Sequence, residues 1–395
     1  MFPEATQGEL PQPESTALAH SERLRERMIA AIDKAGGTLP FSRYVEMALY
    51  EPGLGYYSAG TAKFGAAGDF VTAVDQGDFL ARAIVTTLAP RLAAMADPVI
   101  LEPGGGTGQL AKDILRLLAE RGLERVAYRM LEPSPDLRAR QAELLAPLIA
   151  DGARVSWIDR LEPASITGAI IANEVADALP FDRVLRTESG WAQLAVERAG
   201  REFRWCQAAL NHSQRNEIDA VCGDLDGPPA PGYASEIRPL LSGWVAALCA
   251  ALAAGEILLI DYGLSRREYY HPQRASGTLM CHYRHRAHGD PFIYPGLQDI
   301  TAWVDFSACA HAAHTQEMST AGYATQGGWI AAALETDASL SGTLDIVQAA
   351  RLRTLLLPGE MGERFKALLL SRPPGGAAPL ALPGRDPVSN THLTL

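Results

Sequence analysis

From about residue 98, short apolar runs alternate with segments in which apolar residues recur every three or four positions. This succession is typical of a parallel β-sheet with helices on both faces. The pattern predicts an α/β fold class for this region. We expect helices over 109–120 and 135–148, and strands over 99–101, 127–131, 154–158, 169–172 and 256–261.

The beginning of the chain has a different pattern. Residues 1–20 are polar and contain proline, which is typical of a loose tail. Residues 21–35 have the apolar spacing of an amphipathic helix that two glycines end, and residues 41–50 predict a second short helix. Residues 51–70 are rich in glycine and aromatic residues, which indicates a structured loop.

Two later segments interrupt the succession of strands and helices. Residues 183–210 alternate between apolar and polar positions and predict an inserted β-hairpin. Residues 263–299 have no clear period, and a loop of that length within a compact domain is usually functional. Ser235 is expected to cap a helix over 236–253. The remaining expected elements include a helix over 300–315 and strands over 321–325 and 365–370.

The composition is that of an ordinary globular protein. Of the 395 residues, 47% are hydrophobic and 21% are charged, which excludes a wholly disordered, collagen-like or coiled-coil chain. The formal net charge is −11. Because phosphate contacts need a basic surface, we expect no nucleic-acid partner, whereas a cationic partner suits this charge.

The cysteines and the first residues bear on the compartment. Five scattered cysteines without a C-x-x-C pair indicate reduced thiols. No apolar run reaches the roughly 18 residues that a membrane span needs. The first residues carry Glu4, Glu9 and Glu14 and have no apolar core, unlike a signal peptide or a good transit peptide. We therefore expect a cytoplasmic protein without a membrane span.

A glycine-rich stretch, LEPGGGTG at 101–108, follows a predicted strand and precedes a predicted helix. Gly104, Gly106 and Gly108 allow positive φ and close approach of a ligand, and the helix N-terminus offers unpaired N–H groups. In dinucleotide sites such a loop holds a pyrophosphate. The alternative is a turn that binds nothing. A P-loop pattern for ATP is absent from the sequence.

Two acidic residues favour a cofactor without phosphate. Glu102 at the strand end would repel phosphate but suits an ammonium group, and S-adenosyl-L-methionine carries an ammonium and no phosphate. Glu132 follows the next strand, where an acid can accept both ribose hydroxyls. The predicted cofactor is therefore S-adenosyl-L-methionine.

Polar residues also follow the strand expected at 169–172. Asn173, Glu174 and Asp177 lie at its carboxyl end, which is where open α/β sheets bind ligands. Two carboxylates at this spacing can bind a guanidinium group through charged hydrogen bonds. The alternative is that Asn173 caps a helix whose first turn holds the acids.

Several long stretches match one known family. Together they resemble the MidA-like family of class I S-adenosylmethionine-dependent methyltransferases, whose mitochondrial member is an assembly factor of respiratory complex I. The matching stretches are FSRYVEMALYEPGLGYY (41–57), FGAAGDFVT (64–72), LEPGGGTG (101–108), LEPSP (131–135), ANEVADALP (172–180), LIDYG (259–263), YYHPQRASGTLMCHY (269–283) and PGLQDITAWVDF (295–306).

The resemblance implies a Rossmann-like seven-stranded sheet with added N-terminal helices and an inserted β-hairpin. It also implies cofactor contacts from the glycine loop, from Glu132 and from Gly68, Asp69 and Phe70. The mitochondrial relative methylates an arginine of the complex I 49 kDa subunit to symmetric dimethylarginine. A protein substrate of that type is therefore the expected partner; the oligomeric state stays open, with a homodimer as one alternative.

The expected domain organisation has four parts. A flexible tail (1–20) precedes a helical region that covers the cofactor (21–97). The methyltransferase domain (98–371) carries the insertions at 183–210 and 263–299, and a loose tail (372–395) follows. The chain departs from the family at Val74–Asp78, where relatives usually have P-E-I-S-P.

The segment 281–288 combines a thiol with imidazoles at Cys281, His282, His285 and His288. Zinc accepts such ligands, but the spacing fits no common zinc pattern and two arginines lie among them. We expect no metal; the alternatives are a cover over the substrate channel or a solvated loop.

Methyl transfer is an in-line displacement that needs no metal and no covalent intermediate, so alignment of the reactants is the main requirement. Glu174, Asp177 and Asn173 are the candidate catalytic residues, which would orient a guanidinium. Two other functions stay open: a methyltransferase for a small molecule, and a non-catalytic complex I assembly chaperone.

Overall fold

The computed structural model describes residues 10–58, 72–337, 344–384 and 393. These residues belong to two compact units, which are described separately. Unit 1 comprises Met1–Val71, Asp177–Leu241 and Arg266–Trp303. Unit 2 comprises Thr72–Ala176, Ser242–Ser265 and Val304–Leu395. Both segments expected as insertions fall largely in unit 1.

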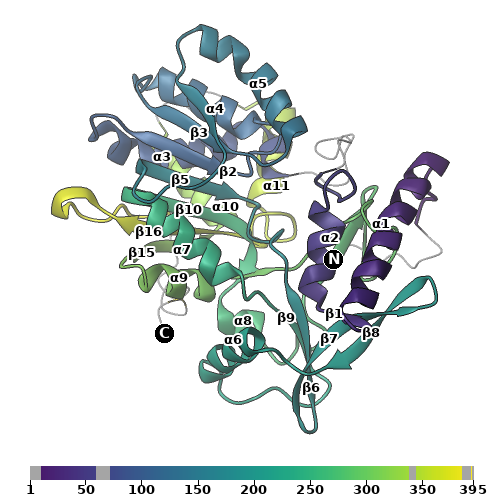
Figure 1. Ribbon diagram of the computed structural model, residues 1–395. Helices are drawn as coiled ribbons and strands as arrows, with labels where there is room; N and C mark the ends of the chain where they lie inside the picture. Colours follow the sequence, from purple (N-terminus) through teal and green to yellow (C-terminus); the bar gives the residue numbers. More distant parts are fainter. Residues whose placement is uncertain (1–9, 59–71, 338–343, 385–392, 394–395) are drawn as a thin grey trace. The chain divides into compact units, whose positions relative to one another are not determined.

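Unit 2 is built on the predicted seven-stranded sheet, with strand order β15-β16-β10-β5-β2-β3-β4 (Figure 1). The five strands β4, β3, β2, β5 and β10 are parallel, and β16 is antiparallel to both β10 and β15. A short eighth strand, β14, pairs with β10. The strands are β2 (Val99–Pro103), β3 (Ala127–Leu131), β4 (Val155–Ile158), β5 (Ile166–Asn173), β10 (Leu252–Leu264), β14 (Val304–Asp305), β15 (Ser319–Thr325) and β16 (Phe365–Arg372).

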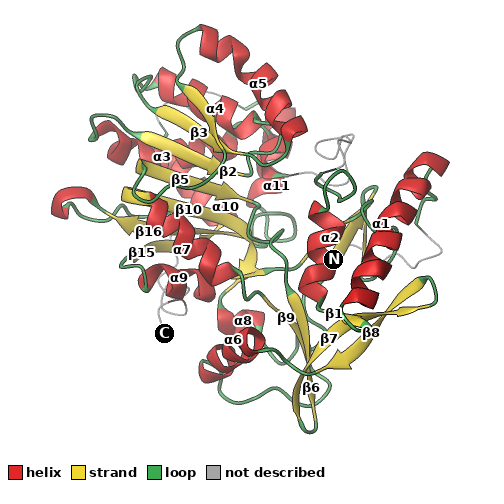
Figure 2. Cartoon of the chain, viewed as in Figure 1, coloured by secondary structure: helices red, strands yellow, loops and turns green. Residues whose placement is uncertain are grey.

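Helices cover both faces of this sheet (Figure 2). Alternate strand residues, such as Ile171 and Leu258, face a core shared with α3, α4 and α10. On the opposite face, Phe306 of α9 packs against Tyr323 of β15. The helices are α3 (Phe79–Ala93), α4 (Gln109–Glu120), α5 (Pro135–Ala150), α7 (Leu241–Ala251), α9 (Phe306–His314), α10 (Gln326–Thr336) and α11 (Ile346–Leu356), with the 3-10 turns η2 (Ala73–Gln76) and η3 (Pro374–Gly376).

The described residues of unit 1 form two antiparallel sheets and four helices. One sheet has the order β1-β7-β6-β9 with β8 on β7, and the other has the order β12-β11-β13. An aromatic cluster that includes Phe41, Trp205 and Phe292 lies in its core. The strands are β1 (Thr38–Leu39), β6 (Asp182–Thr187), β7 (Gly190–Ala199), β8 (Glu202–Ala208), β9 (Ala234–Ile237), β11 (Met280–Tyr283), β12 (Arg286–His288) and β13 (Asp299–Thr301). The helices are α1 (Ser15–Lys34), α2 (Phe41–Tyr50), α6 (His212–Gly223) and α8 (Arg266–Tyr269).

Several sequence expectations need correction. The inserted hairpin is a three-stranded meander within a larger sheet, and the expected loop at 263–299 contains most of a second sheet. Ser235 does not cap a helix: it is buried in β9, where it pairs with Val184, and α7 begins only at Leu241.

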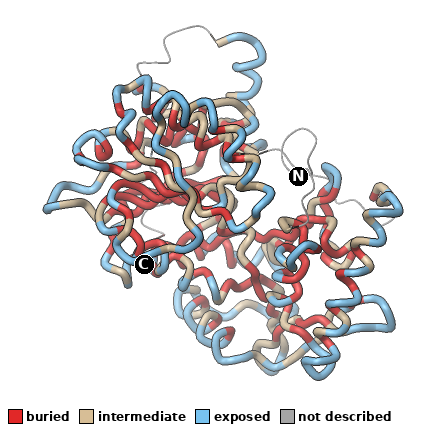
Figure 3. Tube along the Cα trace, turned by 45° about the horizontal axis from the view of Figure 1, so that its top comes forward, coloured by how far each residue is buried: buried red, intermediate tan, exposed pale blue. Residues whose placement is uncertain are grey.

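Both expected tails are shorter than predicted. Helix α1 already begins at Ser15, so the loose tail does not extend to residue 20. Near the other end, Leu382 is buried in the core of unit 2. Figure 3 shows that buried segments follow the strands of the unit 2 sheet, whereas the outer turns are exposed.

Candidate functional site

The glycine loop connects β2 to α4 at the carboxyl edge of the unit 2 sheet. Gly104, Gly106 and Gly108 have φ values of 66°, 51° and 87°, which lie in the left-handed region that favours glycine. The N–H of Gly104 donates to the carbonyl of Leu131 at 3.0 Å. This bond fastens the loop to the end of β3, the strand that precedes Glu132.

The room for a side chain differs between Gly105 and Gly106, two neighbouring residues of the glycine loop. A Cβ on Gly105 would lie 2.5 Å from Met130 Cε, so a side chain cannot fit there. A Cβ on Gly106 would meet no atom of the described residues within 4 Å. The loop is therefore packed against the sheet on the Gly105 side and open on the Gly106 side, as a cradle for a ligand requires.

Glu102, the next-to-last residue of β2 before the loop, is almost fully buried. Its Oε2 accepts a hydrogen bond from the Tyr128 hydroxyl at 2.8 Å. Burial raises the pKa of Glu102 to about 7, a shift that the Tyr128 hydrogen bond opposes and the charge of Glu132 increases. A cation beside Glu102 would favour its ionised form and lower this pKa.

Glu132 lies directly after β3 and is also buried. One carboxylate oxygen accepts from the N–H of Ser134 at 2.9 Å, and the other accepts from Gln141 Nε2 at 3.2 Å. Burial raises the pKa of Glu132, and these two hydrogen bonds oppose the increase. Two fixed donors leave lone pairs on both oxygens for further hydroxyl donors.

The acidic loop after β5 lies against the glycine loop. Val175 Cγ2 would be 3.1 Å from a Cβ on Gly104. Two hydrogen bonds to residues of β10 fix this acidic loop. Asp261 Oδ2 accepts a hydrogen bond from the N–H of Ala176 at 2.9 Å, and the N–H of Glu174 donates to the carbonyl of Ile260 at 2.9 Å.

Two of the predicted catalytic residues have unusual environments within this loop. Glu174 has a φ of 54°, which is rare for a residue with a side chain and is often found at functional sites. Asn173 Nδ2 donates to Glu174 Oε1 at 3.3 Å. Asn173 Oδ1 is buried and accepts no hydrogen bond from the described residues. A buried acceptor without a donor is unfavourable, so this oxygen suits a ligand N–H.

Asp177, the third predicted catalytic residue, belongs to unit 1. Its Oδ2 accepts from the Thr301 hydroxyl at 3.1 Å. Burial, and next the negative charge of Asp299, raise the pKa of Asp177 to about 6. Asn173 and Glu174 therefore lie together in unit 2, whereas Asp177 and its partners Thr301 and Asp299 all belong to unit 1. Binding of one guanidinium by both Glu174 and Asp177 stays a prediction.

The other predicted cofactor residues, Gly68, Asp69 and Phe70, lie outside the described residues. The segment that departs from the family pattern is described from Val74 onward. Asp75 accepts from the N–H of Thr72 at 2.8 Å and so caps its own turn. Asp78 binds Arg82 of α3 at 2.9 Å and Arg116 of α4 at 2.5 Å. The acids of this segment thus have structural partners in unit 2.

The histidine-rich segment forms the hairpin of β11 and β12, in which Cys281 is paired with His288. Arg284 and His285 form its turn with φ values of 47° and 60°. Across the described ranges of the chain, no group of three His, Cys, Asp or Glu side chains is arranged to hold a metal.

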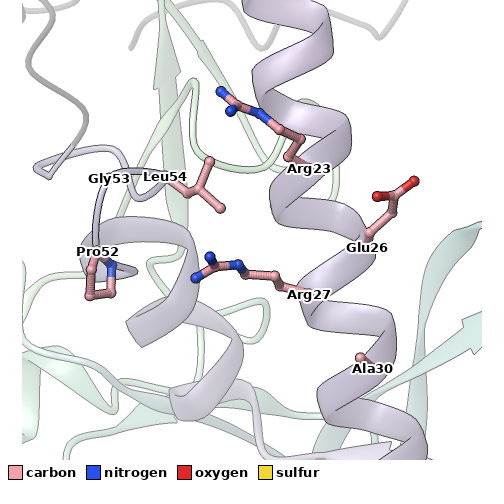
Figure 4. Close-up of a pocket in the computed structure, with 7 residues that line it drawn as sticks. All are labelled: Arg23, Glu26, Arg27, Ala30, Pro52, Gly53 and Leu54. Carbon is pink, nitrogen blue, oxygen red and sulfur yellow. The ribbon is translucent and has the colours of Figure 1, made fainter.

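A surface pocket of unit 1 lies between α1 and the turn after α2 (Figure 4). It contains none of the residues predicted for cofactor or acceptor. Its Arg27 is paired with Glu51 at 2.6 Å. The lining residues are Arg23, Glu26, Arg27, Ala30, Pro52, Gly53 and Leu54.

Two residues of the unit 2 site carried no assigned role in the sequence. Asp261 lies in the LIDYG stretch, and its position at the end of a buried strand was a usable signal. Gln141 lies on α5 outside every motif, and its contacts with the glycine loop and Glu132 are visible only in the structure.

Comparison with known proteins identifies the family. Residues 79–324 match the model of a family described as "Putative S-adenosyl-L-methionine-dependent methyltransferase". The chain belongs to this family. A crystal structure from Burkholderia thailandensis shows a protein described as a superfamily member and "likely methyl transferase", bound to S-adenosyl-homocysteine. Its sequence is 40% identical to this chain, and the match has a TM-score of 0.85 and covers 94% of this chain and 97% of that one. The protein is therefore an S-adenosyl-L-methionine-dependent methyltransferase, and the predicted cofactor is confirmed.

More distant relatives carry more specific names. The mitochondrial "Protein arginine methyltransferase NDUFAF7 homolog" of Drosophila melanogaster is 25% identical and covers 91% of this chain and 87% of its own. The mitochondrial "Protein arginine methyltransferase NDUFAF7" of Danio rerio is 28% identical over 69% of this chain and 68% of its own.

These relatives contradict the expected cytoplasmic location. The Drosophila, Danio and Homo sapiens proteins are all mitochondrial by name. The expectation rested on the scattered cysteines, on the lack of a long apolar run and on the composition of the first residues, and it is wrong by this comparison. Among the described helices, none combines the length and the apolar character needed to cross a bilayer.

Proposed function

We propose that this methyltransferase is a protein arginine N-methyltransferase that forms symmetric dimethylarginine, with a complex I 49 kDa-type subunit as its first candidate substrate. The relatives named arginine methyltransferases support this proposal. The observation that carries it is that Val175 Cγ2 would lie 3.1 Å from a Cβ on Gly104, which supports an acceptor site on the acidic loop next to the glycine loop.

The cofactor would lie on the open side of the glycine loop. Gly106 leaves room there, the Glu102 carboxylate would face the ammonium group, and Glu132 would accept the ribose hydroxyls. Gly104 and Gly108 would hold the backbone in the left-handed conformation that shapes the cradle. Gly68, Asp69 and Phe70 are proposed as further contacts from the family resemblance.

Glu174 and Asn173 would bind the acceptor. A guanidinium presents several N–H donors in a plane, which suits a carboxylate next to an amide oxygen that lacks a donor. A guanidinium has a pKa above about 12, so it arrives protonated. Carboxylate hydrogen bonds would orient it and concentrate electron density on the nitrogen that reacts.

Bound S-adenosyl-L-methionine supplies an activated methyl group on a sulfonium. Glu174 would align the acceptor nitrogen with that methyl, which is the main requirement of an in-line displacement. As the nitrogen–carbon bond forms, the nitrogen loses a proton, and the Glu174 carboxylate would accept it and release it to water. The electrons of the broken sulfur–carbon bond stay on sulfur.

The test is methyl incorporation into the purified 49 kDa-type subunit, with the modified residue located by peptide mass spectrometry. Replacement of the mapped arginine by lysine serves as the control. The proposal predicts dimethylarginine that is lost in the lysine variant. Methylation of a small molecule with the subunit unmodified would favour the small-molecule alternative, and cofactor binding without any transfer would favour the chaperone.

A further inference from the structure

Gln141 of α5 makes three hydrogen bonds from a fully buried position. Its Nε2 donates to the carbonyl of Gly106 at 2.8 Å and to Glu132 Oε2 at 3.2 Å. Its Oε1 accepts from Trp157 Nε1 at 2.8 Å. One amide group thus joins the loop after β2, the acid after β3 and the indole of β4.

The chemistry of the three partners determines the orientation of this amide. An indole N–H can only donate, and a backbone carbonyl and an ionised carboxylate can only accept. The amide oxygen must therefore face Trp157, and both amide hydrogens are used on Gly106 and Glu132. A flipped amide would place like groups against each other at all three contacts.

These contacts hold the parts that would bind the cofactor. Glu132 is fixed on one oxygen by the Ser134 N–H and on the other by Gln141. Gln141 also fixes the glycine loop, because it binds the carbonyl of Gly106, the residue on the open side of that loop. The side chain of Gln141 packs close to Gly108 as well, where a Cβ would lie 3.2 Å from Gln141 Cγ.

We propose that Gln141 is a positioning residue for S-adenosyl-L-methionine, which acts by orienting the Glu132 carboxylate and the Gly106 backbone. This inference rests on the proposed assignment of Glu132 and the glycine loop to the cofactor. Gln141 itself need not touch the cofactor, since both of its polar atoms are already used.

The chain offers a matched control in Gln214 of unit 1. Gln214 is equally buried, and its Nε2 donates to Asp182 Oδ2 at 2.8 Å and to Gln193 Oε1 at 3.1 Å. Its Oε1 accepts from the Asn211 N–H at 2.9 Å. Gln214→Met therefore removes the same three kinds of hydrogen bond as Gln141→Met, at a position with no proposed role in cofactor binding.

The experiment is calorimetric titration with S-adenosyl-homocysteine, combined with thermal unfolding of the free proteins. We expect Gln141→Met to raise Kd about tenfold or more, the range for losing a hydrogen bond to a charged group, and Gln214→Met to leave Kd unchanged. Both variants should unfold at lower temperature. Gln141→Glu keeps the shape of the side chain but replaces the amide donors by acceptors, so it should raise Kd at least as much. It replaces Gln141→Met in the experiment if the methionine variant does not fold.

A double-mutant cycle with Glu132→Ala separates positioning from a general structural effect. If Gln141 acts through Glu132, Gln141→Met should raise Kd clearly less in the Glu132→Ala background than in the wild type. Equal increases in both backgrounds, or an unchanged Kd for Gln141→Met alone, would overturn the inference. An unchanged Kd for Glu132→Ala would instead refute the proposed cofactor site.

Discussion

Val175 Cγ2 lies 3.1 Å from the point that a Cβ on Gly104 would occupy, so the acidic loop after β5 packs directly on the glycine loop after β2. The two strands are neighbours and parallel, and their carboxyl ends meet at one edge of the sheet. This arrangement puts Asn173 and Glu174 close to the proposed cofactor cradle.

Glu132→Ala should weaken binding of S-adenosyl-homocysteine by about 1–3 kcal/mol, the usual cost of losing hydrogen bonds to a charged group. Binding should weaken without vanishing, because the glycine loop stays intact. Calorimetry on the variant and on Glu143→Ala, an exposed position of the following helix α5, provides the measurement and its control. An affinity equal to that of the wild type would show that Glu132 does not hold the ribose.

Glu174→Gln should leave cofactor affinity nearly unchanged and lower turnover steeply. The side chain keeps its shape but loses the charge that would orient a guanidinium and accept its proton. Calorimetry measures the first effect, and methyl incorporation at saturating cofactor measures the second. If both affinity and turnover stayed at wild-type levels, Glu174 would have no role in the acceptor site.

Glu102→Gln should stabilise the cofactor-free protein at alkaline pH. Burial raises the pKa of Glu102 from 4.5 to about 7, so the native state holds a proton that the unfolded chain releases. The stability associated with this proton is complete below pH 4.5 and is lost as the pH rises through 7. Glutamine is neutral throughout, so the variant should be more stable than the wild type by roughly 1–3 kcal/mol at pH 8 and nearly equal at pH 4.5.

Urea unfolding at both pH values measures that difference, and Glu143→Gln on the exposed side of α5 is the control. The same variant should bind S-adenosyl-L-methionine more weakly, because the ammonium loses its carboxylate. A stability difference that does not change with pH would contradict the assignment of the raised pKa to Glu102.

The strands and helices of unit 2 were largely predictable because each has a strong local signal. Helix 109–120 and strand 127–131 have the predicted bounds, and the glycine loop lies between strand and helix as expected. Which segments make up unit 1 was harder to predict from the sequence, because its three segments alternate with those of unit 2 along the chain. Pairing of β1 with β7 joins residues about 160 positions apart, which no local pattern encodes.

The same distinction applies to the candidate site. Glu132 and Glu174 follow strands, so their places at the sheet edge could be predicted from sequence. Gln141 could not, because a single glutamine on a helix has no spacing signal and its partners come from three other segments. Ser235 was misassigned for the opposite reason: a good capping residue lies in a strand when sheet pairing and burial are more favourable.

The most direct test of the proposed cofactor site compares two glycines that flank α4. Gly106 and Gly122 have φ values of 51° and 68°, and a Cβ on either would meet no described atom within 4 Å. Valine at either position should therefore cause similar backbone strain without a clash. Calorimetric titration with S-adenosyl-L-methionine should show that Gly122→Val binds like the wild type while Gly106→Val, folded by circular dichroism, does not bind. Equal binding by the two variants would contradict a cofactor seated on the glycine loop.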